Sequence, residues 1–269
     1  MIHPTAIVHP GAKLDPSVEV GPYAVIDGDV EIGPGCVIGP RVYITGRTRI
    51  GAGNRFHAGA VIGDAPQDLK YRGEPTGVRI GHNNVFREHC TVHRSTIAGE
   101  ETVIGSNNYL MVNSHVGHNA VVGDHVILAN GALLGGHAVV QDRAFLSGNC
   151  LVHQFVRVGT LAMMQGGTAV SQDIPPFTLA HEVNRICGLN IVGLRRAGFS
   201  PDERLELKKL YGLLFRRNRP FREALDEAER LFTSRGARIL IEFARTTKRG
   251  LCADSGGRGR EEGAGEPME

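Results

Sequence analysis

Apolar side chains recur at every sixth position over the first 170 residues of this chain. Counting in steps of six from Ile2 to Val170 gives 29 positions, and 27 of them are apolar, the exceptions being Asp68 and Glu74. A helix repeats every 3.6 residues and a strand every two, so neither accounts for this period. A solenoid of short strands does, because each hexad forms one flat wall and a corner, with its aliphatic side chain in a shared core. The pattern therefore predicts an all-β solenoid, a parallel β-helix with three hexads in each coil.

Two further positions of the hexad agree with this prediction. Four residues after most of the aliphatic positions stands a small side chain, as at Ala24, Cys36 and Ala132. A narrow interior needs large and small side chains to alternate in this way. The position directly after the aliphatic is often glycine, as at Gly39 and Gly117. We expect glycine there to adopt corner dihedrals that other residues avoid.

The hexads also predict where the domains begin and end. They stop near Pro175-Pro176, so the β-helix is expected to span residues 1–176. Residues 64–79 interrupt the pattern but keep its phase, because Ile62 and Ile80 are three hexads apart. An interruption of this kind predicts a loop outside the core, and such loops often carry function.

Beyond the hexads the pattern becomes helical, and a small α-helical C-terminal domain is expected over residues 177–251. The Ser-Pro-Asp-Glu run at 200–203 is a capping box with proline at the first helical position, so it marks a helix start. Apolar stripes predict two further helices, over Pro220–Thr233 and Ala237–Thr247. Residues 252–269 are polar and rich in glycine, and we expect them to be disordered.

Charge and composition narrow the possible partners and compartments. The formal net charge is only +2, but residues 195–222 hold nine Lys and Arg against three Asp and Glu. Such a segment suits an acidic partner or phosphate groups. The five cysteines include no CxxC pair, which suits a reducing compartment. Neither a signal peptide nor an apolar run of about 18 residues is visible, so we expect a cytoplasmic protein without a transmembrane segment.

Four of the twelve histidines fall in one sector of the predicted coil, namely His115, His118, His137 and His153. A step of one coil, 18 residues, leads from His118 to Gly136 and then to Gln154, and adjacent coils lie about 4.8 Å apart. His137 and His153 stand beside these positions. The sequence thus predicts a polar column on the outer surface. Such a column is suited to general-base catalysis, because imidazole titrates near neutral pH, or to metal binding. Unrelated surface histidines are the third interpretation.

No other catalytic motif accompanies this column. The chain contains no GxSxG elbow, no P-loop and no GxGxxG fingerprint. The absence of an activated nucleophile favours direct group transfer over a covalent intermediate. We expect no cofactor, no bound metal and no nucleic-acid partner.

Several short motifs follow one another along the chain. They are Gln67-Asp68-Leu69-Lys70-Tyr71 in the loop, Asn113-Ser114-His115-Val116-Gly117-His118, Leu134-Gly135-Gly136-His137, His153-Gln154-Phe155, Gln172-Asp173-Ile174-Pro175-Pro176, Gly188-Leu189-Asn190, Gly193-Leu194-Arg195-Arg196-Ala197-Gly198-Phe199, and Thr247-Lys248-Arg249-Gly250-Leu251. Together and in this order they resemble the UDP-N-acetylglucosamine O-acyltransferase family over roughly residues 1–251. Members of this family catalyse the first step of lipid A biosynthesis.

The resemblance implies a left-handed parallel β-helix capped by helices and assembled as a homotrimer with active sites between the subunits. The left hand departs from the usual right-handed crossover of parallel strands. The implied acyl donor is an (R)-3-hydroxyacyl chain on acyl carrier protein, whose acidic surface would suit the basic segment at 195–222. The implied acceptor is the 3-hydroxyl of UDP-N-acetylglucosamine.

The resemblance also assigns roles to individual residues. His118 matches the family's catalytic base, and the backbone N–H of Gly136 matches its oxyanion donor, an interaction often worth about 2.7–4 kcal/mol. The positions that contact the sugar, the nucleotide or the phosphopantetheine are matched by Asp68, Lys70, His115, His137, His153, Gln154, Asn190 and Arg196. Gly166 matches the position that gates acyl length, and glycine there predicts a groove open to a long chain.

Three residues depart from the family's pattern. Asn119 follows the base where many members carry Asp, and an amide does not stabilise an imidazolium as a carboxylate does. Val192 and Ala197 stand where Glu and Arg are common, so contacts to the uridine diphosphate are expected to differ in detail.

Other functions stay open from the sequence. The same chemistry could act on a 3-amino sugar nucleotide. The later N-acyltransferase of the pathway shares the hexads but has an added N-terminal uridine-binding domain, whereas here the hexads begin at residue 2. A zinc carbonic anhydrase is built on the same kind of solenoid and needs three histidines around one ion. A non-catalytic scaffold is the remaining class.

Overall fold

The computed structural model describes residues 1–216 and 220–256. The first of its three parallel walls is a nine-stranded sheet, made of β1 (Ile7–Val8), β4 (Val25–Ile26), β7 (Tyr43–Ile44), β10 (Val61–Asp64), β13 (Thr91–His93), β16 (His115–Val116), β19 (Leu133–Leu134), β22 (Leu151–Val152) and β25 (Ala169–Val170). The second sheet consists of β2 (Lys13–Leu14), β5 (Val30–Ile32), β8 (Arg47–Ile50), β11 (Gly77–Ile80), β14 (Glu101–Ile104), β17 (Val121–Val122), β20 (Val139–Val140) and β23 (Arg157–Val158).

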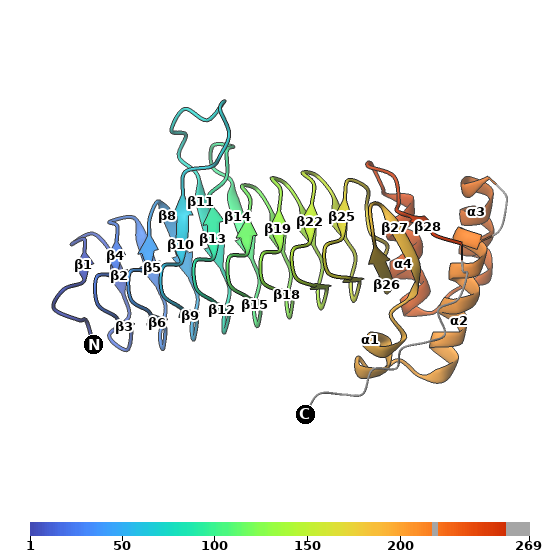
Figure 1. The fold of residues 1–269 in the computed structure, drawn as a ribbon, viewed down its shortest axis with the longest axis horizontal. Helices are drawn as coiled ribbons and strands as arrows, with labels where there is room; N and C mark the ends of the chain where they lie inside the picture. Colours follow the sequence, from blue (N-terminus) through green and yellow to red (C-terminus); the bar gives the residue numbers. More distant parts are fainter. Residues whose placement is uncertain (217–219, 257–269) are drawn as a thin grey trace.

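The third sheet continues past the hexads into the C-terminal part of the chain. Its strands are β3 (Glu19–Val20), β6 (Val37–Ile38), β9 (Arg55–Phe56), β12 (Val85–Phe86), β15 (Tyr109–Leu110), β18 (Ile127–Leu128), β21 (Phe145–Leu146), β24 (Met163–Met164), β26 (Thr178–His181), β27 (Arg185–Leu189) and β28 (Ala253–Asp254). Among the strands described, only β26 and β27 pair antiparallel. The strands stack in a row of coils along the long axis of the molecule (Figure 1). The architecture is therefore the predicted parallel β-helix of hexapeptide repeats.

The core of the β-helix is the hexad pattern itself. Aliphatic positions such as Ile44, Ile62 and Leu128 are fully buried, and the small positions such as Ala132 alternate with them. The first coil is less covered, with Ile2 exposed, and Ala98 is exposed because it lies in a second external loop over residues 94–100. The hexad that contains Ala98 is apolar in sequence but leaves the core.

Two successive loops leave the β-helix at neighbouring corners (Figure 1). The first covers residues 65–76, because β10 ends at Asp64 and β11 begins at Gly77, inside the predicted span of 64–79. The second, residues 94–100, lengthens the next coil, in which Ile80 pairs with Ile104, 24 residues on.

The expected role of the corner glycines is wrong for most of them. Gly63 has a positive φ, but Gly39 and Gly117 do not. A Cβ on Gly39 would lie 2.6 Å from the carbonyl oxygen of Phe56, and one on Gly117 would lie 2.8 Å from the nitrogen of Gly136. Glycine is therefore needed at these positions because the backbone of the next coil approaches closely. The left-handed backbone conformation occurs two residues later instead, at residues such as Asn119 and His137.

Helical segments gather at the C-terminal end of the β-helix (Figure 1). They are α1 (Ile191–Arg196), α2 (Pro201–Tyr211), the π-helical turn η1 (Gly212–Arg216), α3 (Phe221–Leu231) and α4 (Arg235–Arg245). The capping box predicted at the start of α2 is present, with Ser200 and Glu203 each accepting from the other's backbone N–H. Buried leucines and alanines of α2, α3 and α4 form a second core against α1 and the last coil.

The C-terminal segment differs from the expected disorder over 252–269. Ala253–Asp254 pairs with β27, and the Asp254 carboxylate accepts from Tyr211 and Arg216. The remaining part of that expected tail from 257 on lies outside the described residues.

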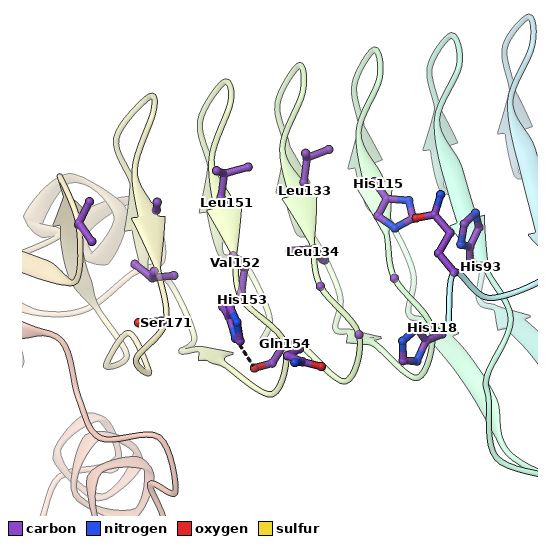
Figure 2. Close-up of a pocket in the computed structure, with 17 residues that line it drawn as sticks. His93, His115, His118, Leu133, Leu134, Leu151, Val152, His153, Gln154 and Ser171 are labelled. Carbon is purple, nitrogen blue, oxygen red and sulfur yellow. Dashed lines mark hydrogen bonds between the residues drawn. The ribbon is translucent and has the colours of Figure 1, made fainter. Parts of the chain in front are cut away.

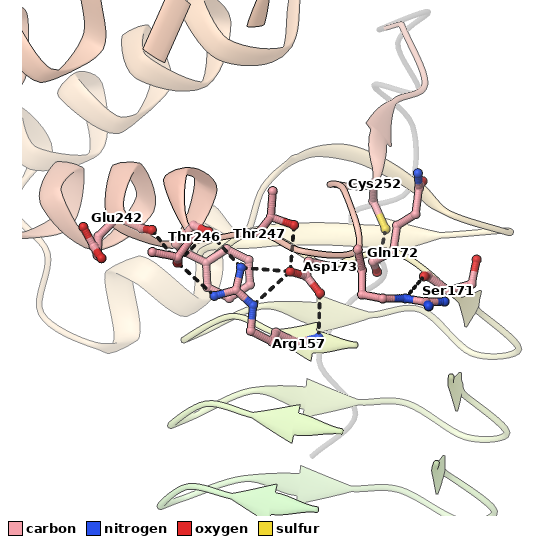
Figure 3. A network of polar contacts seen from close by, with 10 residues as sticks. Arg157, Ser171, Gln172, Asp173, Glu242, Thr246, Thr247 and Cys252 are labelled. Carbon is pink, nitrogen blue, oxygen red and sulfur yellow. Dashed lines mark hydrogen bonds and ion pairs between the residues drawn. The ribbon is translucent and has the colours of Figure 1, made fainter. Parts of the chain in front are cut away.

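A buried polar network joins the last coil to the helices (Figure 3). The Asp173 carboxylate, 1% exposed, accepts hydrogen bonds from the backbone N–H and the guanidinium of Arg157 at 2.8 and 2.9 Å and from Thr247 Oγ1 at 2.9 Å. The same guanidinium donates to the Phe243 carbonyl and lies 4.1 Å from the Phe243 ring. Since both charges are paired and hydrogen-bonded, the network orients α4 and the segment after it against the β-helix.

Candidate active site

The predicted histidine column is present on the outside of the β-helix. Strand pairing places His115 beside Leu133 and then Leu151, so the residues after these strands stack in register. The rings of His118 and His137 lie 5.3 Å apart and perpendicular, and His137 stacks on Phe155 at 4.6 Å. The column starts at the corner that follows the first sheet (Figure 2).

A groove of about 640 Å³ runs along the first sheet beside this column, and we call it the first-sheet groove. It contains five of the predicted residues, namely His115, His118, Gly136, His153 and Gln154. Toward the C-terminal end its wall is formed by Leu133, Leu151, Ala169 and Val183, three of which are exposed large apolar side chains. The groove therefore joins a polar end with histidines to an apolar trough (Figure 2).

The tautomer of His118 follows from the hydrogen bonds of Asn119. The backbone N–H of Thr96 donates to Asn119 Oδ1 at 3.0 Å, which identifies that atom as the amide oxygen. The same oxygen lies 2.9 Å from His118 Nδ1, so Nδ1 must carry the proton and donate. Nε2 is left with its lone pair, as a general base requires.

Gly136 places an unused backbone donor next to this base. A Cβ at position 136 would lie 2.5 Å from His118 Nε2 and Cε1, so only glycine lets the imidazole reach this backbone. Within residues 1–216 and 220–256, no acceptor pairs with the Gly136 N–H. The same hexad position is proline in six N-terminal hexads, at Pro4, Pro10, Pro16, Pro22, Pro34 and Pro40. The stacking of coils therefore does not need this N–H, and it is available to a ligand.

Burial keeps the neighbouring imidazoles neutral. Burial lowers the pKa of His115 to about 4, with the nearby His93 and His118 adding to the effect. Its Nδ1 lies 2.7 Å from Thr91 Oγ1. Burial is also the main cause that lowers the pKa of His137, while the carboxylates of Asp68 and Glu100 act in the opposite direction. At neutral pH these rings are therefore polar hydrogen-bonding groups without charge.

Several groove residues are absent from the predicted binding residues, among them His93, Gln67 and Ser171. The His93 ring lies 4.9 Å from that of His115, and burial lowers its pKa. His93 is one coil before Gly117, but that coil has 24 residues, so a step of 18 does not reveal it. Recognising that this coil contains six extra residues would have placed His93 in the column.

Asp68 and Lys70 lie in the loop at 65–76 and do not line the first-sheet groove. The Asp68 carboxylate accepts from the backbone N–H of Lys70 at 2.8 Å and thereby forms a local turn. The Asp68 carboxylate acts to raise the pKa of His137, against the larger effect of burial. The two external loops hold each other, because Arg94 donates to Tyr71 Oη at 3.1 Å and to the Gly63 carbonyl at 2.9 Å. Tyr71 thus has a structural role.

Asn190 and Arg196 lie on a different wall from His118. Both line a groove of about 780 Å³ over the third sheet, which we call the third-sheet groove, together with Val192, Ala197 and apolar side chains of β18, β21 and β24. The Asn190 amide caps α1, accepting from Gly193 N at 2.9 Å and donating to the Leu161 carbonyl. One chain therefore presents the predicted residues in two separate groups.

Gly166 lies between these two walls, at the exposed corner between β24 and β25. A Cβ there would meet only the Gly148 carbonyl oxygen, at an ordinary 3.6 Å. A Cβ at position 166 therefore meets no clash.

Other predicted features are only partly covered by the structure. Arg217 and Arg219 of the basic segment lie outside the described residues. In the part of the chain that the structure covers, no three His, Cys, Asp or Glu side chains are grouped to hold a metal ion. None of the helices described is long and apolar enough to cross a membrane.

Family models and solved structures agree with the β-helix and the C-terminal helices described above. Residues 29–64 and 101–136 match the bacterial transferase hexapeptide model, and residues 173–252 match domain 2 of UDP N-acetylglucosamine O-acyltransferase. A solved UDP-N-acetylglucosamine acyltransferase from Francisella novicida superposes with a TM-score of 0.92 at 36% identity over 95% of each chain. One from Bacteroides fragilis gives 0.89 at 39% identity, covering 93% of this chain and 99% of that one. Fold and column together define a hexapeptide-repeat acyltransferase.

Curated relatives narrow this class. The acyl-[acyl-carrier-protein]–UDP-N-acetylglucosamine O-acyltransferase of Anaeromyxobacter sp. (strain Fw109-5) is 44% identical over 253 residues, which cover 93% of this chain and 98% of the relative. That of Myxococcus xanthus (strain DK1622) is 47% identical over the same shares. The chain belongs to the UDP-N-acetylglucosamine O-acyltransferase family.

Proposed function

We propose that this chain transfers an (R)-3-hydroxyacyl group from acyl carrier protein to the 3-hydroxyl of UDP-N-acetylglucosamine, the first step of lipid A biosynthesis. The observation that carries the proposal is the pairing of His118 and Gly136. An imidazole with a free Nε2 lies against an unused backbone N–H at the polar end of an apolar trough. Base and oxyanion donor are the two groups that direct acyl transfer needs.

The mechanism follows from these two groups. His118 Nε2 takes the proton of the 3-hydroxyl as its oxygen attacks the thioester carbonyl carbon. The carbonyl oxygen gains negative charge and accepts a hydrogen bond from the Gly136 N–H. When the carbonyl re-forms, the carbon–sulfur bond breaks, and the imidazolium returns the proton to the departing thiolate. The ester and the free phosphopantetheine thiol are the products.

The trough of Leu133, Leu151, Ala169 and Val183 is proposed to hold the acyl chain. Burying methylenes against these side chains contributes about 0.8 kcal/mol each, so the length of the trough would select the length of the chain. Gly166 is proposed as the gate at its far end, since it leaves the corner between the two walls unfilled. The basic residues of α1 and α2 are proposed to meet the acidic carrier protein.

We also propose that the active site is completed in a homotrimer of left-handed β-helices. Support comes from the separation of the two groups, because His118 faces the first-sheet groove whereas Asn190 and Arg196 line the third-sheet groove. Both walls also carry exposed apolar side chains, among them Leu151 and Val192, which association would cover. A neighbouring copy would bring its third-sheet groove, with Arg196, toward the nucleotide.

The deciding experiment is an acyl-transfer assay with acyl carrier proteins of graded chain length, run against UDP-N-acetylglucosamine and its 3-amino analogue. Wild type is expected to acylate the hydroxyl acceptor, and His118→Ala is expected to lose about 10²–10⁴ in kcat. His125→Ala is the matched control, because His125 also occupies a corner but lies outside the first-sheet groove. Transfer to the amino analogue alone, or full activity of His118→Ala, would overturn the proposal.

A further inference from the structure

The external loop at residues 94–100 packs its polar groups onto one side chain, that of Asn119. Asn119 is 8% exposed and directly follows the base, His118. Its amide oxygen accepts from the backbone N–H and the hydroxyl of Thr96, both at 3.0 Å. The same oxygen accepts from His118 Nδ1 at 2.9 Å. The loop therefore determines how the amide is turned, and the amide determines the tautomer of His118.

The amide nitrogen of Asn119 donates to two further groups of the loop. Ser95 Oγ accepts at 2.6 Å, and Glu100 Oε2 accepts at 3.2 Å. The hydrogen bonds form a chain from the Glu100 carboxylate through the Asn119 amide to His118 Nδ1–H. Hydrogen bonds in such a chain polarise one another, so a negative charge at one end strengthens the acceptor at the other.

The catalytic step needs negative charge at the end of this chain. When Nε2 takes a proton, His118 becomes an imidazolium, and the neutral amide beside it offers only a dipole. Among the described residues, Glu100 is the carboxylate hydrogen-bonded to that amide. A carboxylate one amide away still favours the charged ring.

We propose that Glu100 is a positioning residue for the base, acting through Asn119 to orient His118 and to favour its imidazolium form. This inference rests on the proposed function, in which His118 accepts the proton. Glu100 is exposed, so solvent screens its charge and the effect is expected to be several-fold.

Other titratable groups face His118 and share its electrostatics. They are His93, His115 and His137 from the neighbouring strands and corners, with Asp68 acting near His137 from the loop at 65–76. Burial lowers the pKa of each of these three imidazoles, and Glu100 acts in the opposite direction on His137. Because Glu100 also acts on His137, the pH at which His118 takes up its second proton has to be followed at the His118 ring itself.

The proposal predicts that the negative charge of Glu100 can be replaced by a carboxylate at position 119, next to His118. Asn119→Asp would place a second carboxylate oxygen where the amide nitrogen now lies 3.2 Å from Glu100, and two adjacent carboxylates repel. In the Glu100→Gln background the new amide at position 100 can instead donate to the carboxylate introduced at position 119, which restores one negative charge next to His118. The two substitutions are therefore expected to compensate each other.

The test compares kcat and its pH dependence in Glu100→Gln, Asn119→Asp and the double variant. Glu100→Gln is expected to lower kcat about three- to tenfold and to shift the acid limb of the pH–rate profile to lower pH, because the protonated ring loses stabilisation. Asn119→Asp is also expected to lower kcat, and the double variant to exceed both single variants. A double variant worse than either one, or a Glu100→Gln enzyme identical to wild type, would overturn the proposal.

Two control variants separate charge from packing. Glu101→Gln removes the neighbouring carboxylate, whose partners are Arg49 and Arg79 on the second sheet, and is expected to leave the profile unchanged. Ser95→Ala removes a neutral hydrogen bond from the same amide nitrogen, so it is expected to lower kcat without moving the acid limb. A shift of the limb in Ser95→Ala equal to that in Glu100→Gln would contradict a role for the charge.

An NMR measurement keeps this inference separate from the proposed function. In the free protein, ¹⁵N-labelled histidine is expected to show His118 with its proton on Nδ1, and Glu100→Gln is expected to make the ring take up its second proton at lower pH. Failure of this shift refutes the role of Glu100 even if the enzyme is active. An inactive wild type that shows the shift refutes the proposed function alone.

Discussion

At the scale of single residues, the site uses a backbone position that the solenoid leaves free. The slot two residues after each core aliphatic turns the chain, and six N-terminal hexads place proline there. His118, Gly136 and Gln154 occupy the same slot in three successive coils. Side chains and an N–H that the ladder does not need are thus available for chemistry on a rigid frame.

Gly136→Ala tests the close approach of His118 to this frame. The added methyl group would lie 2.5 Å from the imidazole, so the ring must move away from the 136 N–H. We expect kcat to fall at least about 10²-fold, the cost of losing one oxyanion donor, with little change in the melting temperature. Gly148→Ala, at the same slot of another corner with a nearest neighbour at 3.5 Å, is the control and should retain activity.

The stability of the site should depend on pH through His115. Its pKa is about 4 in the folded chain against 6.5 for an ordinary histidine, so the unfolded chain binds more protons between these values. The free energy of unfolding is therefore expected to fall as pH drops from about 6.5 to 4, by up to about 1.4 kcal/mol per pH unit for one proton. Urea unfolding at several pH values measures this slope.

His115→Gln is expected to flatten that slope, since the substituted side chain cannot take up a proton. Substituting the exposed His3 provides the matched comparison. An equally steep slope in His115→Gln would show that other groups carry the dependence.

At the scale of elements, the coil keeps a constant cross-section while its corners accept insertions. The loops at 65–76 and 94–100 leave successive coils, hold each other through Arg94 and Tyr71, and frame the polar end of the first-sheet groove. The walls between the corners keep an apolar inner face, while the outer face of the second sheet carries ion pairs such as Lys13–Glu31 and Arg79–Glu101. The corners therefore carry both the candidate catalytic residues and Gly166, the proposed gate of acyl length.

Gly166→Met tests the proposed gate of the trough. The backbone there has room for a side chain, so the variant should fold normally while its thioether occupies the corner beyond the trough. The preferred acyl chain is expected to become shorter by several methylenes, measured with acyl carrier proteins of graded length. Gly148→Met lies one coil nearer to His118 and should shorten the preference further. An unchanged length profile in both variants would remove Gly166 from this role.

At the scale of the whole molecule, two cores meet at the last coil. The β-helix core and the helical core are joined by the network of Asp173, Arg157 and Thr247 (Figure 3). The Asp173 carboxylate of the Arg157–Asp173 ion pair is buried, so the pair has a well-defined geometry. It sets where α4 and the segment after it lie against the last coil.

Asp173→Asn tests this junction. The Arg157 guanidinium would lose its carboxylate partner, and breaking a buried pair on one side costs about 3–5 kcal/mol. We expect a lower free energy of unfolding and a first transition assigned to the C-terminal helices, measured by urea unfolding with circular dichroism. Asp226→Asn removes a carboxylate paired with Arg245 at the surface and should cost under about 1 kcal/mol. Equal effects of the two substitutions would contradict the special role of the junction.

Much of this molecule could be predicted from its sequence because a solenoid repeats one local rule. A period of six with apolar residues in one slot determines the strands, the core and the coil, and a step of 18 brings His118, Gly136 and Gln154 together. The prediction fails where a hexad keeps its apolar residue but does not form part of the core. The hexad with Ala98 keeps the period but leaves the core, so both the second loop and the place of His93 in the site were missed.

Only the tertiary structure decided the polar details. The orientation of the Asn119 amide depends on hydrogen bonds from the loop at 94–100, which the hexad pattern does not encode. The free Nε2 of His118 and the hydrogen bond to Glu100 both depend on that orientation. The separation of Asn190 and Arg196 from the column likewise follows from which wall each element covers. A repeat specifies its own interior by local pattern. The directions of outward side chains depend on distant segments, which are known only once the coils are stacked.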